Sequence, residues 1–304
     1  MRRFDGVEHL RSSTMPSAER PSCVLSIAGS DSGGGAGVQA DLKAFARCGV
    51  HGMTAITALT AQNTVGVTAV EAVSPAMIVE QVRAVAEDIG VDAVKIGMLG
   101  SVDTIEAVEH ALDLAGDVPV VLDPVMVAES GAVLLHEDAR RALRKRLLPR
   151  ATVATPNLSE ARVLAEAGRL DGGPGGAAPD LGAAREAADG AGSLARAVHA
   201  LGPDAVVVTG GHRAEAADVF FDGARIVAIP GERHPDGAAH GSGCTHSSAL
   251  AAFLARGAAP LDAARAAREV AAAAVRDGLR GLGAGPGPVD ALNIARRTGV
   301  VALT

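Results

Sequence analysis

The sequence predicts an α/β fold built around a mostly parallel sheet, and two observations lead to this prediction. Apolar runs of strand length alternate with segments of helical composition, the order expected when helices connect the strands of a parallel sheet. About five of these runs also end in short polar or glycine-rich stretches. In open parallel sheets the carboxyl ends of the strands meet at one edge, which is where ligands bind.

The first element is a short apolar strand at residues 23–28, followed by a glycine-rich loop at 29–37 and a helix at about 38–48. Residues 118–122 are a continuous apolar run, typical of a strand buried on both faces, and Pro75 suits the first turn of a helix. Further strands are expected at residues 52–59, 67–73, 93–96, 152–155 and 205–209, with a hairpin at 219–221 and 225–229. Further helices are expected at residues 75–89, 102–114, 138–148, from 156 onwards, behind residues 240–245 and at 261–278.

One domain accounts for most of the chain. Its 304 residues, 48% of them hydrophobic, are enough for one large α/β domain. The chain has no Trp or Tyr and only five Phe, so the core must be built from Val, Leu, Ile and Ala. We expect residues 1–21 to form a flexible tail and residues 22–304 a single domain. Residues 168–192 are rich in Gly, Ala, Pro and Asp and are expected to be a flexible insertion.

Charge and cysteine content narrow the class of protein. A net charge of −7 argues against nucleic acid or an anionic membrane as the main partner. The three cysteines contain no Cys-x-x-Cys pair, which favours a reducing cytoplasm. No apolar run follows the N-terminal arginines as a signal peptide requires, and no apolar segment reaches membrane-spanning length without a charge. We therefore expect a cytoplasmic protein.

The stretch from His240 to Thr245 (His-Gly-Ser-Gly-Cys-Thr) carries the strongest chemical signal. Gly241 and Gly243 flank Ser242 and allow a tight turn, and an alanine-rich helix follows. A turn at a helix N-terminus collects backbone N–H donors and the positive end of the helix dipole, so it can bind an anion or charge that develops during phosphoryl transfer. Cys244 at the helix start is expected to favour the thiolate. The alternative is an ordinary tight turn with a buried cysteine.

The common nucleotide motifs are absent. Gly35-x-Gly37-x-x-Ala40 is a loose dinucleotide fingerprint, but the acid expected about 20 residues later is missing. No lysine follows a glycine, as a P-loop requires. A dinucleotide-dependent dehydrogenase is therefore disfavoured. The polar residues after the strands also have simpler interpretations, because Asn157 and Glu160 could form a capping box, and Gln62 and Met98 could be ordinary loop and core residues.

Seven blocks in a fixed order nevertheless resemble one family, the hydroxymethylpyrimidine/phosphomethylpyrimidine kinases of the ribokinase-like superfamily. The resemblance covers about residues 22–282 without the 168–192 segment. The blocks are Gly29–Asp31, Gly34–Lys43, Thr57–Thr64, Lys95–Leu99, Asp123–Met126, Thr155–Ala161 and His240–Thr245. The resemblance implies a central mostly parallel sheet with helices on both faces, commonly in a homodimer.

The resemblance also implies an activity and a pocket. The expected reaction is ATP-dependent phosphorylation of 4-amino-5-hydroxymethyl-2-methylpyrimidine and of its monophosphate. The pyrimidine pocket of the family maps onto Gly29, Asp41, Gln62, Met98 and Val125. Asp41 and Gln62 could match the donor and acceptor edge of the ring, and the other residues could supply apolar walls.

The phosphate end maps onto later blocks. Asp123 and Glu160 match the positions that handle Mg²⁺, which prefers hard oxygen ligands and retains water. Asn157, Thr209 and Gly211 match ATP-binding positions. Residues 241–244, which are Gly241, Ser242, Gly243 and Cys244, match the anion hole. Cys244 stands where many related sugar kinases carry an aspartate base.

One departure and two alternatives remain. Thr209 stands where this family often has a lysine, which leaves one phosphate contact in doubt. A pyridoxal-type kinase of the same superfamily is an alternative, because pyridoxal also carries a hydroxymethyl group. A non-catalytic pyrimidine-binding protein is the other, with Thr209 as its support.

Overall fold

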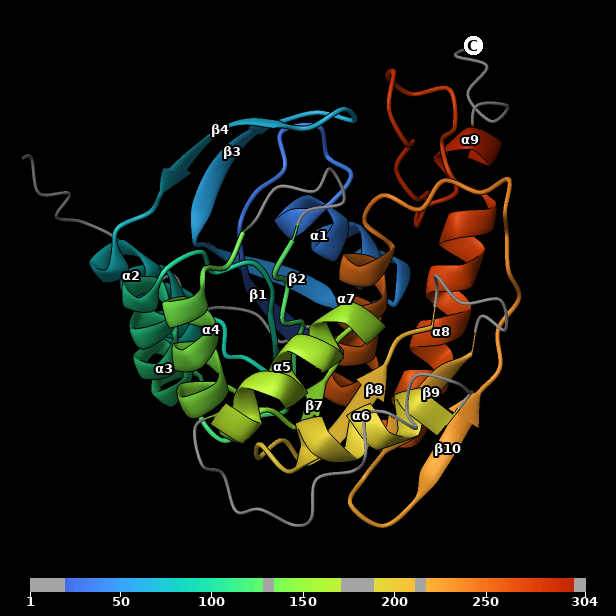
Figure 1. Ribbon diagram of the computed structural model, residues 1–304. Helices are drawn as coiled ribbons and strands as arrows, with labels where there is room; N and C mark the ends of the chain where they lie inside the picture. Colours follow the sequence, from blue (N-terminus) through green and yellow to red (C-terminus); the bar gives the residue numbers. More distant parts are fainter. Residues whose placement is uncertain (1–19, 128–133, 171–188, 211–216, 298–304) are drawn as a thin grey trace, which may run out of the picture.

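A computed structural model describes residues 20–127, 134–170, 189–210 and 217–297 (Figure 1). An eight-stranded sheet forms its centre, in the order β10-β9-β8-β7-β6-β5-β1-β2. The strands β8, β7, β6, β5, β1 and β2 pair in parallel. Strand β9 pairs antiparallel with both β8 and β10. The predicted mostly parallel sheet and the hairpin near its end are therefore confirmed. The strands are β1 (Cys23–Ala28), β2 (His51–Ile56), β5 (Ala93–Ile96), β6 (Val120–Leu122), β7 (Val153–Ala154), β8 (Ala205–Val208), β9 (Asp218–Phe221) and β10 (Ile226–Ile229).

Helices cover both faces of the sheet, as the resemblance implied. One face carries α2 (Pro75–Asp88), α3 (Val102–Ala115), α4 (Glu137–Arg146), α5 (Leu158–Leu170) and α6 (Asp189–His199). The other carries α1 (Gly37–Arg47), α7 (Ser242–Ala255) and α8 (Pro260–Arg276). A short 3₁₀ turn, Leu148–Arg150, and α9 (Ile294–Arg297) complete the described elements.

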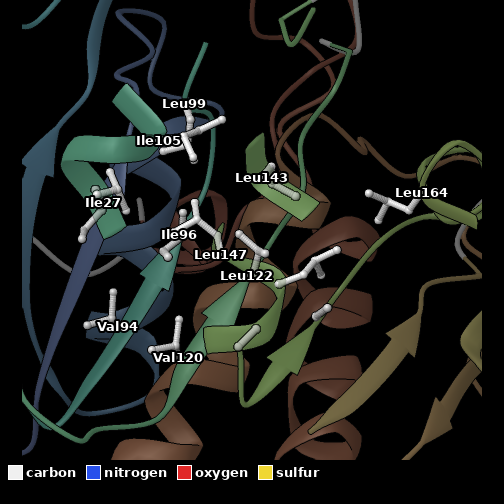
Figure 2. Close-up of a cluster of buried hydrophobic side chains, with 14 of the residues drawn as sticks. Ile27, Val94, Ile96, Leu99, Ile105, Val120, Leu122, Leu143, Leu147 and Leu164 are labelled. Carbon is white, nitrogen blue, oxygen red and sulfur yellow. The ribbon is translucent and has the colours of Figure 1, made fainter. Parts of the chain in front are cut away.

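The side chains of β1 show how one strand serves two cores. Leu25 and Ile27 point into the cluster under α2 to α6, whereas Val24 points to the opposite face because successive strand residues alternate. Figure 2 shows the first cluster, where branched aliphatic side chains of the central strands meet those of the covering helices. The second cluster is rich in buried alanines of α7 and α8, so these helices pack with small side chains against the sheet.

The predicted strand at residues 52–59 is wrong in one respect, because the chain leaves the main sheet at Thr57. Residues 51–56 form β2, and the chain continues as β3 (Ala58–Gln62), which pairs with β4 (Val67–Ala72) in a separate antiparallel ribbon. The Thr57 N–H donates to the Ala28 carbonyl at 3.0 Å and its hydroxyl to the Met98 carbonyl at 2.8 Å. Both bonds hold the bend against the ends of the central strands.

Two predicted segments lie largely outside the described residues. Of the predicted tail, residues 20 and 21 are described. Of the predicted insertion at 168–192, residues 168–170 end α5 and residues 189–192 begin α6. Within the described residues, no helix combines the length and apolarity needed to cross a membrane.

Candidate active site

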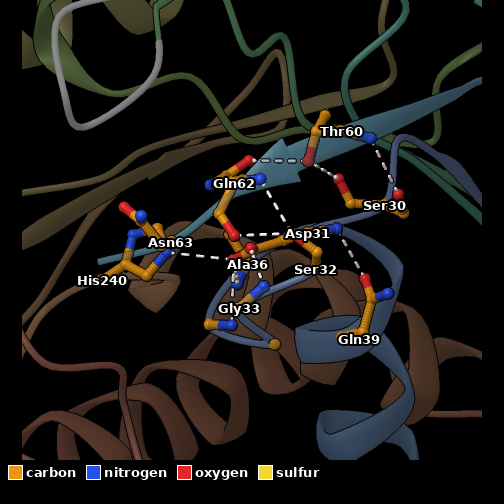
Figure 3. A network of polar contacts seen from close by, with 12 residues as sticks. Ser30, Asp31, Ser32, Gly33, Ala36, Gln39, Thr60, Gln62, Asn63 and His240 are labelled. Carbon is orange, nitrogen blue, oxygen red and sulfur yellow. Dashed lines mark hydrogen bonds and ion pairs between the residues drawn. The ribbon is translucent and has the colours of Figure 1, made fainter. Parts of the chain in front are cut away.

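The glycine-rich loop after β1 is organised by one carboxylate, that of Asp31 (Figure 3). It accepts hydrogen bonds from the backbone N–H groups of Gly33 at 2.8 Å, Gly35 at 3.0 Å and Ala36 at 2.7 Å. The His240 ring lies 3.2 Å away through Nε2. Burial by itself would raise the pKa of Asp31, but the bonds from His240, Ala36 and Gly33 outweigh burial and lower the pKa below its ordinary value. The Asp31 carboxylate therefore holds both the loop after β1 and His240, the residue before the Gly241 turn.

The glycine turn leads directly into α7. Gly241 has φ 83° and is the N-cap of α7, and a Cβ at this position would overlap the carbonyl oxygen of Gly35. Only glycine fits both requirements. The Ser242 N–H donates to the Ala239 carbonyl at 2.9 Å. The first-turn N–H groups of Gly243 and Cys244 lack a carbonyl acceptor within the helix, so they can bind an anion.

Cys244 differs from its expected ionisation. Burial raises the pKa of its thiol to about 12, with Asp41 and Asp123 contributing in the same direction. Lys95 and a hydrogen bond from the Gly37 N–H oppose the shift and do not cancel it. The prediction of a thiolate at neutral pH is therefore wrong for this structure. Desolvation of a thiolate beside the buried Asp41 and Asp123 therefore exceeds the stabilisation by Lys95 and the Gly37 N–H.

Asp41 lies beneath the site rather than on its surface. Its carboxylate is fully buried and accepts from Lys95 Nζ at 2.9 Å, Ser26 Oγ at 2.6 Å and Ser248 Oγ at 2.7 Å. Protein groups therefore contact both carboxylate oxygens, and the predicted contact of Asp41 with a pyrimidine stays a prediction. Burial would lower the pKa of Lys95, but Asp41, Cys244 and Asp123 raise it above its ordinary value. Lys95 therefore stays charged inside the protein.

The other predicted pocket residues lie at strand ends. Gly29 follows β1, Met98 follows β5 and Val125 follows β6, and these three strands are neighbours in the sheet. Gly29 contacts Met98 so closely that a Cβ would overlap the Met98 methyl group. Met98 keeps part of its surface exposed, unlike an ordinary core residue. Gln62 ends β3 and is also half-buried, and its Oε1 accepts from the Thr60 hydroxyl at 3.3 Å.

Asn157 and Glu160 form a reciprocal capping box at the start of α5. Asn157 Oδ1 accepts from the N–H groups of Ser159 at 2.9 Å and Glu160 at 3.0 Å, and the Glu160 carboxylate accepts from the Asn157 N–H at 2.9 Å. The simpler interpretation of this pair is therefore confirmed. Thr209 pairs with Asn157 in an isolated parallel bridge, so two predicted ATP-binding residues are adjacent. Gly211 lies outside the described residues.

Asp123 is also close enough to Glu160 to raise its pKa. Burial raises the pKa of Glu160 to about 8, and the charge of Asp123 adds to this shift. Burial raises the pKa of Asp123 too, against the opposing influence of Lys95 and the Ser247 hydroxyl, which donates at 2.9 Å. Two buried carboxylates with raised pKa values fit a hard divalent cation, whose charge would offset their repulsion. The described residues contain no cluster of three or more acidic, histidine or cysteine ligands, so any such ion would need further ligands.

Sequence reasoning missed Asp31 and Lys95 as functional candidates. The sequence does contain an indication for Asp31, because an aspartate just before several glycines can accept hydrogen bonds from their N–H groups. A signal for Lys95 exists as well, because a single lysine in the apolar run at residues 93–96 must find an acid inside the protein.

Comparison with known proteins gives a consistent result. Residues 31–290 match the family described as phosphomethylpyrimidine kinase. A hydroxymethylpyrimidine/phosphomethylpyrimidine kinase from Rhizobium meliloti is 48% identical over 87% of this chain and 95% of its own length. The protein of the same name from Bacillus subtilis is 40% identical over 88% and 93%.

Solved structures of two kinds are similar. The ADP complex of Bacillus subtilis pyridoxal kinase is 36% identical, with a TM-score of 0.77 over 90% of this chain and 99% of that chain. A phosphomethylpyrimidine kinase from Clostridium difficile is also 36% identical, with a TM-score of 0.66 over 82% and 96%.

The position of the Asp31 carboxylate leads to a stability prediction. Asp31→Asn replaces one acceptor oxygen with an amide that faces N–H donors, so we expect the free energy of unfolding to fall by about 2–3 kcal/mol. Because the pKa of Asp31 is lowered in the folded state, its contribution is fully present above about pH 4 and is lost as the pH falls through the folded value. Urea denaturation at several pH values measures both effects.

The matched control is Asp222→Asn. Asp222 also accepts backbone N–H bonds, from Ala224 and Arg225, but in an exposed turn. We expect a much smaller change there. Equal losses in the two variants would contradict a special role for Asp31.

Proposed function

This chain belongs to the phosphomethylpyrimidine kinase family, and we propose that it phosphorylates 4-amino-5-hydroxymethyl-2-methylpyrimidine and then its monophosphate, with ATP as the donor, in thiamine biosynthesis. The observation that carries this proposal is the glycine-capped start of α7, where N–H donors lie at the ends of the central strands beside Asp41, Lys95 and Asp123. Phosphoryl transfer needs such a preorganised array, because catalysis consists mainly of positioning and charge stabilisation.

We assign the phosphate end of the site to residues around α5 and α7. Asp123 and Glu160 would hold Mg²⁺ in part through water, and the ion would neutralise phosphate charge when bound. Asn157, Thr209 and Gly211 are proposed to contact ATP. The ADP complex of the similar pyridoxal kinase supports a nucleotide site in this fold. Residues 241–244 would stabilise the transferring phosphoryl group through backbone N–H groups.

We assign the pyrimidine pocket to Gly29, Gln62, Met98 and Val125. The Gln62 amide offers both a donor and an acceptor to an aminopyrimidine edge, and Met98 and Val125 offer apolar walls. Asp41 supports this pocket from below by holding Lys95 and Ser248. The reaction uses ATP and the three cysteines are unpaired, which supports a cytoplasmic location.

Substrate choice can be tested directly. Pyridoxal kinase is the second candidate, because pyridoxal kinases are among the similar structures. We expect ATP consumption with the hydroxymethylpyrimidine and with its monophosphate to exceed that with pyridoxal.

In Gln62→Leu the pyrimidine KM should rise about 5- to 150-fold, equivalent to about 1–3 kcal/mol for an unpaired polar contact. An unchanged KM would remove Gln62 from the pocket, and preference for pyridoxal would reverse the substrate assignment.

Cys244 is proposed to accept the proton of the substrate hydroxyl. Because the pKa of the thiol is raised to about 12, the active thiolate is the minor form near neutral pH. As long as the pH is below that pKa, the thiolate fraction increases tenfold for each unit by which the pH is raised, so kcat should rise between pH 7 and 10. Cys244→Ala should lower kcat by about 10²-fold or more and abolish the rise. Cys244→Asp should recover part of the rate and flatten the profile.

Steady-state kinetics with thermal melts of each variant measures this. A Cys244→Ala enzyme within threefold of the wild-type kcat, with the same pH profile, would end the base hypothesis. The backbone N–H groups of α7 would then account for the catalysis.

A homodimer is proposed through the β3–β4 ribbon. Leu59, Val65 and Val70 are exposed on this ribbon, by 51%, 66% and 53%, and burial of apolar side chains is favourable. A second copy could cover these side chains. Sedimentation velocity should give the mass of a dimer for the wild type and a larger monomer fraction for Val65→Glu. A monomeric wild type at micromolar concentration would contradict the proposal.

A further inference from the structure

A glycine-rich segment near the C-terminus, residues 281–287, lies against the tip of the β3–β4 ribbon. Figure 1 shows the ribbon tip directed toward this segment, which follows α8. The Gly285 N–H donates to Thr64 Oγ1 at 3.2 Å. Thr64 lies in the turn that joins β3 and β4, two residues after Gln62.

This segment contacts both the backbone and the side chain of Thr64. A Cβ at Gly285 would overlap the Thr64 carbonyl oxygen, and one at Gly283 would overlap the Thr64 side chain. Gly283 also has φ +78°, which side-chain-bearing residues rarely adopt. Gly281 differs, because a Cβ there would meet nothing within 4 Å. Glycine is therefore required where the segment crosses Thr64 and is dispensable at Gly281.

The base of the segment is fixed to the body of the protein. The Leu279 N–H donates to the Pro288 carbonyl at 2.9 Å, which closes the loop. The Val289 N–H donates to the His240 carbonyl at 3.0 Å, and Val289 packs with Ala274 of α8 and Ala291. The segment therefore contacts the ribbon from a firm support that includes the residue before the anion turn.

The glycine-rich loop also holds the ribbon tip. Ser32 Oγ donates to the Gln62 carbonyl at 2.6 Å and accepts from the Gln62 N–H at 2.8 Å. The turn itself is ordered by Asn63, whose Oδ1 accepts from the N–H groups of Val65 at 2.9 Å and Gly66 at 3.1 Å. Gln62 thus bonds to Ser32 of the loop, and Thr64, two residues further on, contacts residues 281–287 as the second support.

We propose that residues 281–287 clamp Thr64 and thereby position Gln62 for recognition of the pyrimidine edge, with Gly285 and Thr64 as positioning residues. This inference rests on the proposed pyrimidine pocket. A carboxamide that must donate and accept at a ring edge needs a fixed backbone, since a displacement of about 1 Å can cost orders of magnitude in rate. None of the hydrogen bonds and close contacts described above joins the clamp to α5 or to the Asn157–Thr209 pair, so ATP binding should be insensitive to it.

The test compares Gly285→Ala with Gly281→Ala, the same change in the same segment. Gly285→Ala must displace Thr64, so the pyrimidine KM should rise about tenfold or more while the ATP KM stays within about twofold. Amide hydrogen exchange at residues 62–66 should be faster, because the tip loses one support. Gly281→Ala should match the wild type in all three measurements, and thermal melts check that both variants fold.

A second pair of variants guards against misfolding of Gly285→Ala. Thr64→Val removes the acceptor of the Gly285 N–H and should raise the pyrimidine KM about threefold. Thr64→Ser keeps the hydroxyl and should have the wild-type pyrimidine KM. Wild-type values in both Gly285→Ala and Thr64→Val would overturn the clamp. An ATP KM that rises as much as the pyrimidine KM would overturn its role in substrate recognition.

Failure of the proposed pocket would look different. An unchanged pyrimidine KM in Gln62→Leu would overturn the assignment of Gln62 and with it the recognition role of the clamp. Exchange at residues 62–66 needs no substrate, so faster exchange in Gly285→Ala alone would still establish the physical contact.

Discussion

The site depends on the Asp31 carboxylate more than on any other single group. Segments about 200 residues apart in the chain meet at its two oxygens, the loop after β1 on one side and His240 on the other. Neither segment has regular structure of its own at this point, so the carboxylate supplies the acceptors that a sheet or helix would otherwise provide. The glycines at positions 35 and 241 then pack backbone against backbone, which brings the start of α7 to the end of β1.

Carboxyl groups are concentrated in the interior under α7. Asp41, Asp123 and Glu160 are all buried, and Lys95 is the cation that lies fully buried among them. Lys95 pairs with Asp41, and burial together with the charge of Asp123 raises the pKa of Glu160. This concentration of buried carboxyl groups is unfavourable for folding alone, and it is suited to a site that binds a divalent cation together with phosphate.

Much of the fold follows from the sequence, because strands buried on both faces are continuous apolar runs. Residues 118–122 and 205–209 are recognisable in this way, and β6 and β8 lie within them. The departure of the chain from the sheet at Thr57 is not recognisable, because residues 52–59 keep strand-like composition across the bend. The bend depends on hydrogen bonds to Ala28 and Met98, which are remote in sequence.

The sequence predicts that the candidate site lies at the ends of neighbouring strands. It does not predict how deeply the ionisable groups are buried or how their pKa values are shifted. Gly29, Met98 and Val125 follow adjacent strands as expected. The depth of Asp41 and the pKa of Cys244 both depend on burial, which a motif does not report. The buried carboxylate of Asp41 accepts from Lys95 and two serines, and desolvation raises the pKa of the Cys244 thiol.

The buried pair of Lys95 and Asp41 has an evolutionary consequence. Loss of either partner alone would leave an unpaired charge in the interior, which typically costs 3–5 kcal/mol, a large part of the stability of most domains. Joint replacement by apolar residues of similar volume is often tolerated for stability, but here it would also remove the acceptor for Ser26 and Ser248. Positions 41 and 95 should therefore change together or not at all during divergence, and the two serines should change with them.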